Sequence, residues 1–134
     1  MKKLLTALAA VSMTALCAAP VQAAPVAPTG TSMLLSVYTL NDGSGAPSTK
    51  LDAWYLDCFP PAGTHPDYKK ACKVLAKVDG WIEAIERDGR ACTKEYKPVT
   101  LRVEGTWKGR ELYWSNYYGN RCEAAAATQD VYPV

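Results

Sequence analysis

The chain has 134 residues, of which 15 are basic, 13 are acidic and 49% are hydrophobic. This length suits one domain, and the near balance of charge disfavours a nucleic-acid-binding protein, which normally carries a basic stripe. Beyond the first residues, no apolar run is long enough to predict a membrane span. We therefore expect a single domain that binds neither nucleic acid nor membrane.

The N-terminus has the pattern of a secretory signal peptide over residues 1–23. Two lysines are followed by the short apolar run 4–19 and by small residues that end at Ala23, with Ala24 as an alternative cleavage point. Cleavage removes both lysines, so that basic and acidic residues become equal in number, and it removes one of the five cysteines. We therefore expect a secreted, extracellular protein.

The four remaining cysteines predict two disulfides, because an even number in an exported chain is typical of paired cysteines. They are Cys58, Cys72, Cys92 and Cys122. The local pairs, first with second and third with fourth, are the simplest of three possible pairings, and the sequence alone does not decide among them. Each disulfide is expected to stabilise the fold by about 3–4 kcal/mol. With no CxxC pair and a single histidine, we expect no metal site.

After the signal peptide we expect a flexible arm over residues 24–32 and one domain over residues 33–134. Two apolar runs, 33–40 and 50–58, are typical of strands, and the Asn- and Gly-rich segment between them is typical of a loop. The prolines of residues 59–66 exclude a helix, so we expect an ordered loop there.

A helix is predicted to begin near Pro66 or Asp67, because proline is tolerated in the first turn and an acidic residue suits the helix dipole. Apolar residues at helical spacing continue it towards Asp79. Residues 81–85 predict a second short helix, with Gly89 as its stop.

The last part of the chain alternates in the manner of strands. Residues 99–104 alternate apolar and polar side chains, and Gly105 is predicted to permit a tight turn. Residues 107–118 predict the next strand and residues 131–132 a short last one, whereas the alanine run 124–127 suggests no element. Several antiparallel strands with two short helices indicate an α+β fold.

No residue constellation in the sequence indicates catalysis. His65 is the only histidine, and its position between Thr64 and Pro66 favours a structural role. The glutamates form no evident acid–base pair, and phosphate-binding and dinucleotide motifs are absent. We expect no catalytic residue and no cofactor. The alternative is a small secreted hydrolase of the microbial ribonuclease type that uses His65, and the third possibility is a sugar-binding module that uses exposed tryptophans.

The segment from Cys92 to Pro98 is the strongest candidate for function. Cys92 stands two residues before Lys94, so a disulfide there would pin the segment while the lysine projects. An extended, pinned loop with one protruding basic side chain suits the specificity pocket of a protease and is a poor shape for most catalysis.

A set of motifs extends over residues 33 to 134. They are Cys58-x-Pro60, Gly63-Thr64-His65-Pro66, Ala71-Cys72, Val78-x-Gly80, Cys92, Tyr96-x-Pro98-Val99-x-Leu101-x-Val103-x-Gly105-x-Trp107-x-Gly109 and Asn120-x-Cys122-Glu123. Through them the chain resembles the Streptomyces subtilisin inhibitor family of secreted serine-protease inhibitors. The resemblance implies a five-stranded antiparallel sheet with two short helices on one face, the disulfides Cys58–Cys72 and Cys92–Cys122, and a homodimer formed through the sheet.

The same resemblance implies a reactive bond, Lys94–Glu95, in which Lys94 is the primary specificity residue. The rest of the implied protease-binding loop is Ala91, Cys92 and Thr93 before the bond and Tyr96 after it. The implied partners are serine proteases. A lysine suits trypsin-like enzymes, which carry an aspartate at the floor of the pocket, and subtilisin-like enzymes are expected as further targets.

Overall fold

The computed structural model describes residues 30–40 and 47–134 of the chain. The predicted signal peptide and residues 24–29 of the predicted arm lie outside the described residues. The described elements are β1 (Ser32–Leu40), β2 (Pro47–Asp57), β3 (Ala62–Gly63), α1 (Tyr68–Lys77), the 3-10 turn η1 (Ile82–Ala84), β4 (Val99–Trp107), β5 (Arg110–Tyr118) and α2 (Arg121–Thr128).

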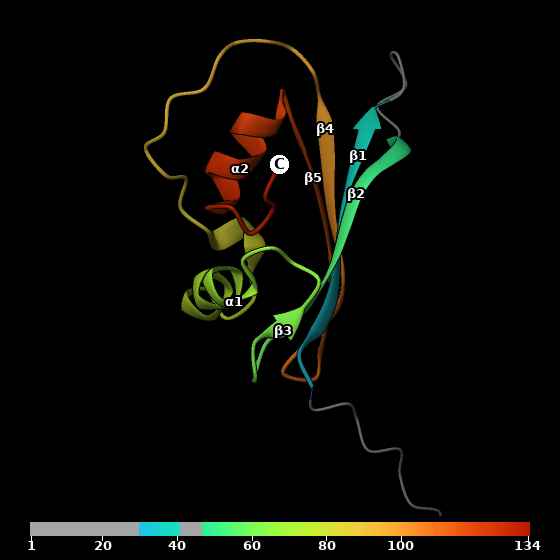
Figure 1. Ribbon diagram of the computed structural model, residues 1–134, viewed down its shortest axis with the longest axis vertical. Helices are drawn as coiled ribbons and strands as arrows, with labels where there is room; N and C mark the ends of the chain where they lie inside the picture. The colour runs from blue at the N-terminus through green and yellow to red at the C-terminus, as the bar shows by residue number, and fades with distance from the viewer. Residues whose placement is uncertain (1–29, 41–46) are drawn as a thin grey trace, which may run out of the picture.

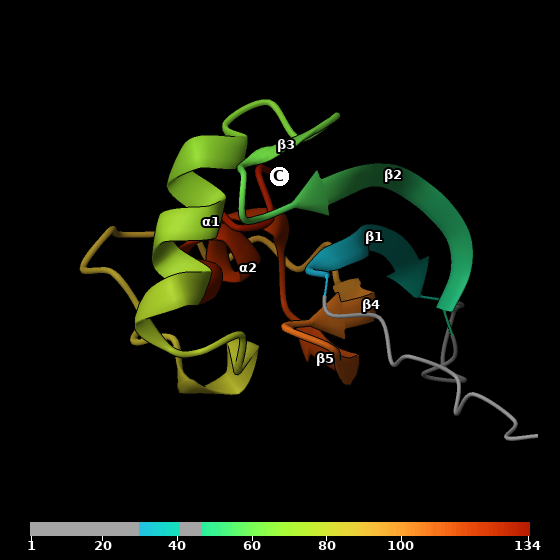
Figure 2. The same cartoon turned by 90° about the horizontal axis from the view of Figure 1, so that it is seen from below.

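The strands form one antiparallel sheet in the order β3-β2-β1-β4-β5, with β1 in the centre. Figures 1 and 2 show both helices on the same side of this sheet, and no described element covers its other face. The predicted fold is therefore confirmed: a five-stranded antiparallel sheet, two helices on one face and two disulfides.

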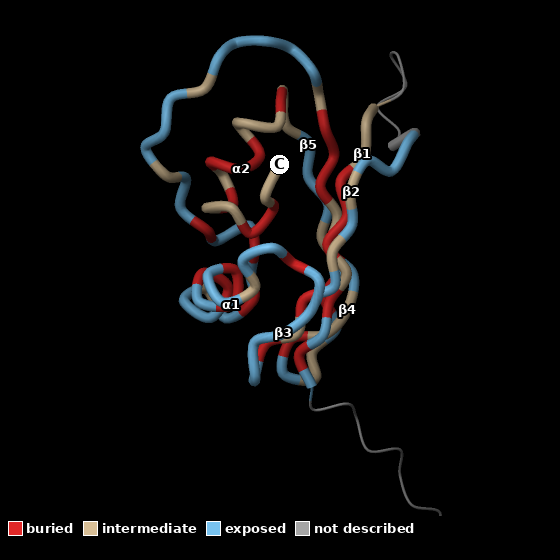
Figure 3. The backbone as a smooth tube through the Cα atoms, in the orientation of Figure 1, coloured by how far each residue is buried: buried red, intermediate tan, exposed pale blue. Residues whose placement is uncertain are grey.

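The core lies between the sheet and the helices. Successive side chains of a strand point to opposite faces, and in β1 the side chains of Met33, Leu35 and Val37 are almost fully buried on the helix-facing side. Trp107 and Tyr132 are the largest fully buried side chains. In Figure 3 the buried parts of the trace lie where the sheet and the helices face each other. A long loop, residues 85–98, runs past the edge of this core.

The first helix begins where the sequence predicts. The Asp67 carboxylate caps α1 by accepting a hydrogen bond from the backbone N–H of Lys70 at 3.1 Å, which satisfies one of the donors left unpaired at a helix start. The buried side chains of the helix are Ala71, Cys72, Val74 and Leu75. The predicted loop before α1 also contains the two-residue strand β3, which pairs with the end of β2.

The second helix does not lie where the sequence predicts. Within residues 81–85 only the 3-10 turn η1 forms, and Ile82 in it and Ile85 directly after it are buried, at the three-residue spacing of such a turn. The second α-helix is α2, built from the alanine run that suggested no element. Its signals are Asn120 as N-cap and Glu123 three residues later, followed by alanine, the best helix former.

Two smaller predictions are also wrong. Gly105 makes no turn but lies within β4 at φ 150°, where an added Cβ would come within 2.2 Å of the backbone oxygen of Ser32. The β4–β5 turn is Lys108–Gly109, both at positive φ, as a type I′ hairpin turn requires. Residues 131–132 form no strand and are instead fully buried irregular chain.

The last residues of the predicted arm contact the domain. The backbone oxygen of Gly30 accepts a hydrogen bond from Gly109 N at 3.1 Å. Thr31 is buried, and its backbone oxygen accepts from Cys58 N at 3.2 Å. The part of the predicted arm that the structure describes, residues 30–32, is therefore hydrogen-bonded to the domain.

Candidate functional site

The candidate site is a long segment, residues 85–98, that connects η1 to β4 without forming a helix or strand. In Figure 1 it passes around α2 and over one end of the sheet, and Figure 3 shows it exposed along most of its length. A segment with no regular backbone ladder needs other contacts to hold one conformation. Here those contacts come mainly from α2 and from the residues beside it.

Charged side chains hold the first half of the segment. The Arg90 guanidinium donates hydrogen bonds to Asp88 (2.9 Å) and to Asp130 (2.7 and 2.8 Å). Lys70 of α1 also donates to Asp130, at 2.7 Å. Arg90, and after it Lys70, lower the pKa of the Asp130 carboxyl to about 2. The carboxylate is therefore charged at neutral pH and links the segment to both helices.

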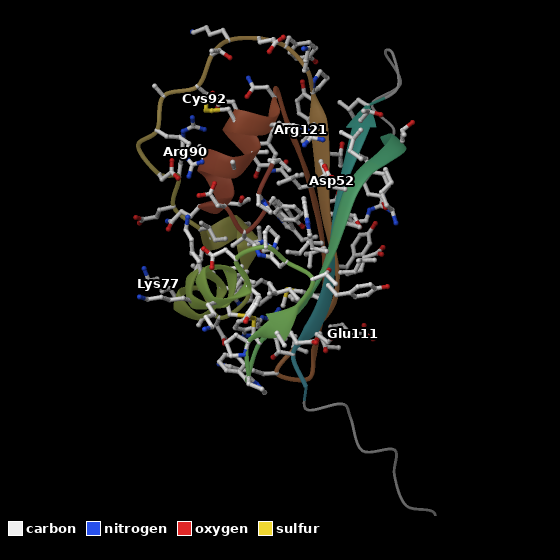
Figure 4. All side chains as sticks on the ribbon, in the orientation of Figure 1. Asp52, Lys77, Arg90, Cys92, Glu111 and Arg121 are labelled. Carbon is white, nitrogen blue, oxygen red and sulfur yellow. A yellow bond between two sulfur atoms is a disulfide. The ribbon has the colours of Figure 1, made fainter. Side chains whose placement is uncertain are left out.

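The Cys92–Cys122 disulfide fastens the middle of the segment to the first turn of α2. The two Cα atoms lie 5.6 Å apart, and Figure 4 shows the bond beside this helix. The helix is itself tied to the sheet, because Arg121 pairs with Asp52 of β2 at 3.0 Å. The disulfide thus fixes the position of the loop relative to α2 and, through the Arg121–Asp52 ion pair, relative to the sheet.

Asn120 supports the loop at its most exposed part. Its side-chain nitrogen Nδ2 donates to the backbone oxygens of Thr93 (3.1 Å) and Glu95 (2.9 Å). Its Oδ1 accepts from the backbone N–H of Glu123 at 2.9 Å and so caps α2. The side chain of Asn120 therefore joins the helix start to the carbonyl groups on either side of Lys94.

The second half of the segment is tied to the end of β5. The backbone N–H of Lys97 donates to Gly119 O at 2.9 Å. The hydroxyl oxygens of Tyr96 and Tyr117 lie 2.7 Å apart, a contact that raises the pKa of Tyr117. These bonds fix the chain on both sides of Tyr96.

Lys94 differs from the other basic residues of the segment. The described ion pairs of the segment are Arg87–Glu123, Arg90–Asp88, Arg90–Asp130 and Lys97–Glu95. Lys94 is exposed, and no hydrogen bond or ion pair of its side chain is found among the described residues. Its charge is therefore available to a partner.

A cavity of about 650 Å³ lies behind the second half of the segment. It is lined by Thr93 and residues 95–98 on the loop side, and by Leu40 and Leu51 on the sheet side. The loop is therefore not packed tightly on the core here, and its support comes from the disulfide and from the hydrogen bonds that Asn120, Gly119 and Tyr117 make with it.

The predicted loop residues all lie on this segment. Ala91, Thr93, Lys94, Glu95 and Tyr96 are exposed, and Cys92 is partly buried. Sequence reasoning did not assign a role to Asn120, although it stands in one of the motifs. Its loop partners are more than 20 residues away in sequence, and only the fold brings them together.

His65 has the structural role that its neighbours favour. Its ring is 2% exposed, Nδ1 accepts from the backbone N–H of Asp67 at 3.0 Å, and Nε2 donates to Val131 O at 3.0 Å. Burial lowers the pKa of the imidazole. A ring with both nitrogens engaged and no access to solvent does not support the hydrolase alternative.

Metal-binding clusters and membrane-spanning helices are both absent from residues 30–40 and 47–134. In these ranges no group of three or more His, Cys, Asp or Glu side chains is placed to hold a metal ion. Among the same residues, no helix has the length and apolar character needed to cross a membrane.

Comparisons with known proteins agree with this geometry. The family model described as "Subtilisin inhibitor-like" matches residues 30–120. Protease inhibitor SIL-V2 of Streptomyces orinoci is 38% identical over 99 residues, which cover 72% of this chain and 91% of the relative. The transglutaminase-activating metalloprotease inhibitor of Streptomyces mobaraensis is 36% identical over 100 residues, which cover 72% of this chain and 68% of the relative.

A solved structure shares the fold. The crystal structure of Streptomyces caespitosus sermetstatin in complex with Bacillus licheniformis subtilisin matches with a TM-score of 0.62 at 30% identity, covering 78% of this chain and 99% of that one. This chain belongs to the subtilisin inhibitor-like family.

Proposed function

We propose that this protein is a secreted inhibitor that binds serine proteases as a substrate does, through the reactive bond Lys94–Glu95. The pairing of charges supports this most directly: Lys94 has no partner among the described residues, whereas Arg90 and Lys97 on either side are paired. The extended loop presents this one free lysine with the backbone on both sides held by Asn120.

The loop contacts supply a reason for inhibition rather than digestion. Thr93 and Glu95 lie on opposite sides of the bond, and both are held by Asn120. If a protease cut the bond, the new ends would stay side by side, and re-formation would compete with release. Because the free loop is already ordered, binding costs little conformational entropy. A dissociation constant below ~10⁻⁹ M is therefore expected, as for tight protease–inhibitor pairs.

The side chains of the loop indicate the class of target. The Lys94 ammonium suits the aspartate at the floor of a trypsin-like pocket. Ala91, Cys92 and Thr93 would occupy the subsites before the bond. Subtilisin is proposed as a further target, held in part through these residues and the backbone, and the likeness to sermetstatin in its complex with subtilisin supports this.

Titration of the purified, oxidised protein against trypsin and subtilisin tests the proposal. The complex is then quenched in acid and analysed by mass spectrometry. Stoichiometric inhibition with slow clipping at Lys94–Glu95 is expected. Rapid cleavage without inhibition, or no effect on either enzyme, would refute the proposed function.

We also propose a homodimer formed through the uncovered face of the sheet. Tyr55 (61% exposed) and Tyr113 (71% exposed) are large apolar side chains that solvent reaches on the described surface, and a second copy would bury them. Sedimentation analysis should give a dimer for the wild type and a monomer for Tyr113→Lys. A monomeric wild type would contradict this proposal.

Export through residues 1–23 is part of the same proposal. The two disulfides suit an oxidising compartment outside the cytoplasm. N-terminal sequencing of protein recovered from culture medium should begin at Ala24 or Pro25. Intact protein that remains inside the cell would contradict it.

A further inference from the structure

Glu95 and Lys97 form an ion pair immediately after the proposed reactive bond. Lys97 Nζ lies 2.8 Å from Glu95 Oε1, and the two side chains are 76% and 60% exposed, in that order. The two charges therefore lie together on the exposed surface that directly follows the proposed reactive bond.

The backbone beneath this ion pair is fixed at both of its residues. The backbone oxygen of Glu95 accepts from Asn120 at 2.9 Å, and the backbone N–H of Lys97 donates to Gly119 at 2.9 Å. Between them, Tyr96 is tied to Tyr117 by its hydroxyl. An exposed ion pair normally contributes little, partly because two flexible side chains must be ordered. Here the backbone is already placed, so only the two side chains remain to be ordered.

A carboxylate next to the reactive bond opposes the role of Lys94. A pocket that attracts a lysine is acidic, and an acidic rim near it would repel an isolated Glu95. Lys97 offsets this charge, and its hydrogen bond to Glu95 raises the pKa of the Lys97 ammonium. Lys97 therefore keeps its charge at neutral pH, where it offsets the charge of the Glu95 carboxylate.

We propose that Lys97 is a specificity-determining residue of the inhibitor, because it neutralises Glu95 and so admits serine proteases with an acidic rim beyond the scissile bond. This inference rests on the proposed function. When the protease excludes water from the loop, the attraction between the two side chains strengthens, and so does the repulsion that would follow from losing Lys97.

A double-mutant cycle tests the inference. The inhibition constant against trypsin is measured for the wild type, Glu95→Gln, Lys97→Met and the double variant, at low and high salt. Lys97→Met should weaken inhibition about 5- to 10-fold at low salt, and the loss should shrink at high salt because salt screens exposed charges. The double variant should recover most of the loss, since no unpaired carboxylate remains.

Two further variants serve as controls. Lys73→Met on α1 removes the same charge from an exposed position outside the loop and should leave the inhibition constant unchanged. Lys97→Arg keeps the charge and should retain inhibition. Thermal melting confirms that each variant is folded.

The outcomes separate this inference from the proposed function. If the wild type inhibits trypsin and is clipped at Lys94–Glu95, but the effects of the two substitutions simply add, Lys97 has no such role. Equal inhibition by the wild type and Lys97→Met would overturn it as well. If the wild type does not inhibit at all, the proposed function fails first, and this inference fails with it.

Discussion

The two disulfides of this molecule are chemically alike but restrain very different surroundings. Cys58 and Cys72 are 2% and 5% exposed and join the end of β2 to α1 inside the core. Cys92 and Cys122 are partly exposed and join an irregular loop to α2 across a sequence separation of 30. Around the first bond, packed side chains already fix the backbone. Around the second, a cavity lies close by, and separate hydrogen bonds and ion pairs hold the loop in place of packed side chains.

The first disulfide therefore affects mainly the stability of the fold, whereas the second also affects the conformation of the loop. In the core, a covalent bond adds to restraints that packing also provides. In the loop, it is one of the separate bonds that hold an exposed segment in one conformation, and the proposed inhibition depends on that conformation. The variants below are chosen to affect one region without the other.

Removing the side chain that the loop presents should have the largest effect. Lys94→Ala should weaken trypsin inhibition by ~2–8 kcal/mol, the range of interface hot spots, while thermal unfolding stays unchanged because Lys94 is exposed. Lys94→Met should shift preference towards subtilisin. The exposed Lys73→Ala on α1 is the matched control. An unaltered trypsin inhibition constant for Lys94→Ala would exclude Lys94 as the specificity residue.

Removing each disulfide tests the comparison itself. Replacing Cys58 and Cys72 by alanine should lower the free energy of unfolding by about 3 kcal/mol, and the same change at Cys92 and Cys122 should have a similar effect. Only the second pair should also accelerate clipping at the reactive bond. Chemical denaturation gives the stability, and mass spectrometry during incubation with trypsin gives the rate of clipping.

The result would be decisive in either direction. If both double variants are clipped equally fast while folded, the two disulfides restrain the loop alike, and the contrast between core and loop is lost. If neither variant is clipped faster than the wild type, the hydrogen bonds and ion pairs of the loop suffice to hold it without the disulfide.

A substitution at Asn120 should have a smaller and more selective effect. Asn120→Asp keeps an oxygen that can cap α2 but removes the amide donor to Thr93 and Glu95. Losing these bonds should weaken inhibition by about 1–3 kcal/mol and speed clipping, with little change in the unfolding temperature. Asn120→Ala, which loses the cap as well, should also melt earlier. Equal clipping of the wild type and Asn120→Asp would show that the amide does not support the loop.

The smallest expected effect is a pH dependence of the free energy of unfolding, which arises in the sheet-and-helix part of the molecule and does not involve the loop. Burial lowers the pKa of His65 in the folded state, whereas an unfolded histidine titrates near its ordinary value of about 6.5. Below that pH the unfolded chain binds a proton that the folded chain does not, so the free energy of unfolding should fall as the pH falls. Denaturation between pH 7 and pH 5 measures this slope.

The variant His65→Gln removes the titrating group. It should flatten the slope in that range, although the loss of the two ring hydrogen bonds lowers stability at every pH. An equal slope in both proteins would mean that other groups account for it. Asp130 does not affect the slope measured in this test. Its pKa in the folded state is lowered to about 2, so its contribution to the free energy of unfolding is lost only in more acid solution.

The sequence predicts the frame well where local signals agree with burial. The apolar run of β1, the alternation of β4 and the acidic residue at the start of α1 are local features, and they identify three elements correctly. The α2 helix was missed because a short alanine run carries almost no amphipathic pattern. Its signal lies instead in the Asn120 cap, which precedes the run.

The loop likewise has features that the sequence predicts and features that it does not. Its position and its free lysine can be predicted from Cys92 and Lys94. The pairing of Lys97 with Glu95, and the bonds from Asn120, could not be predicted, because they depend on the folded path of the loop and on the chain reversal through β4 and β5. Likewise, the place of Gly105 could not be predicted. A glycine often indicates a turn, but this one lies in the middle of β4, because β1 approaches it too closely for a side chain.

Asn120 also gives the molecule a built-in reporter. Its Oδ1 holds the backbone N–H of Glu123, and its Nδ2 holds the loop. Any event that pulls the amide away from the loop will also change the exchange of the Glu123 amide hydrogen with solvent. Hydrogen exchange at this one position on a helix could therefore follow opening, cleavage and resealing of the loop without a label on any residue that a protease touches.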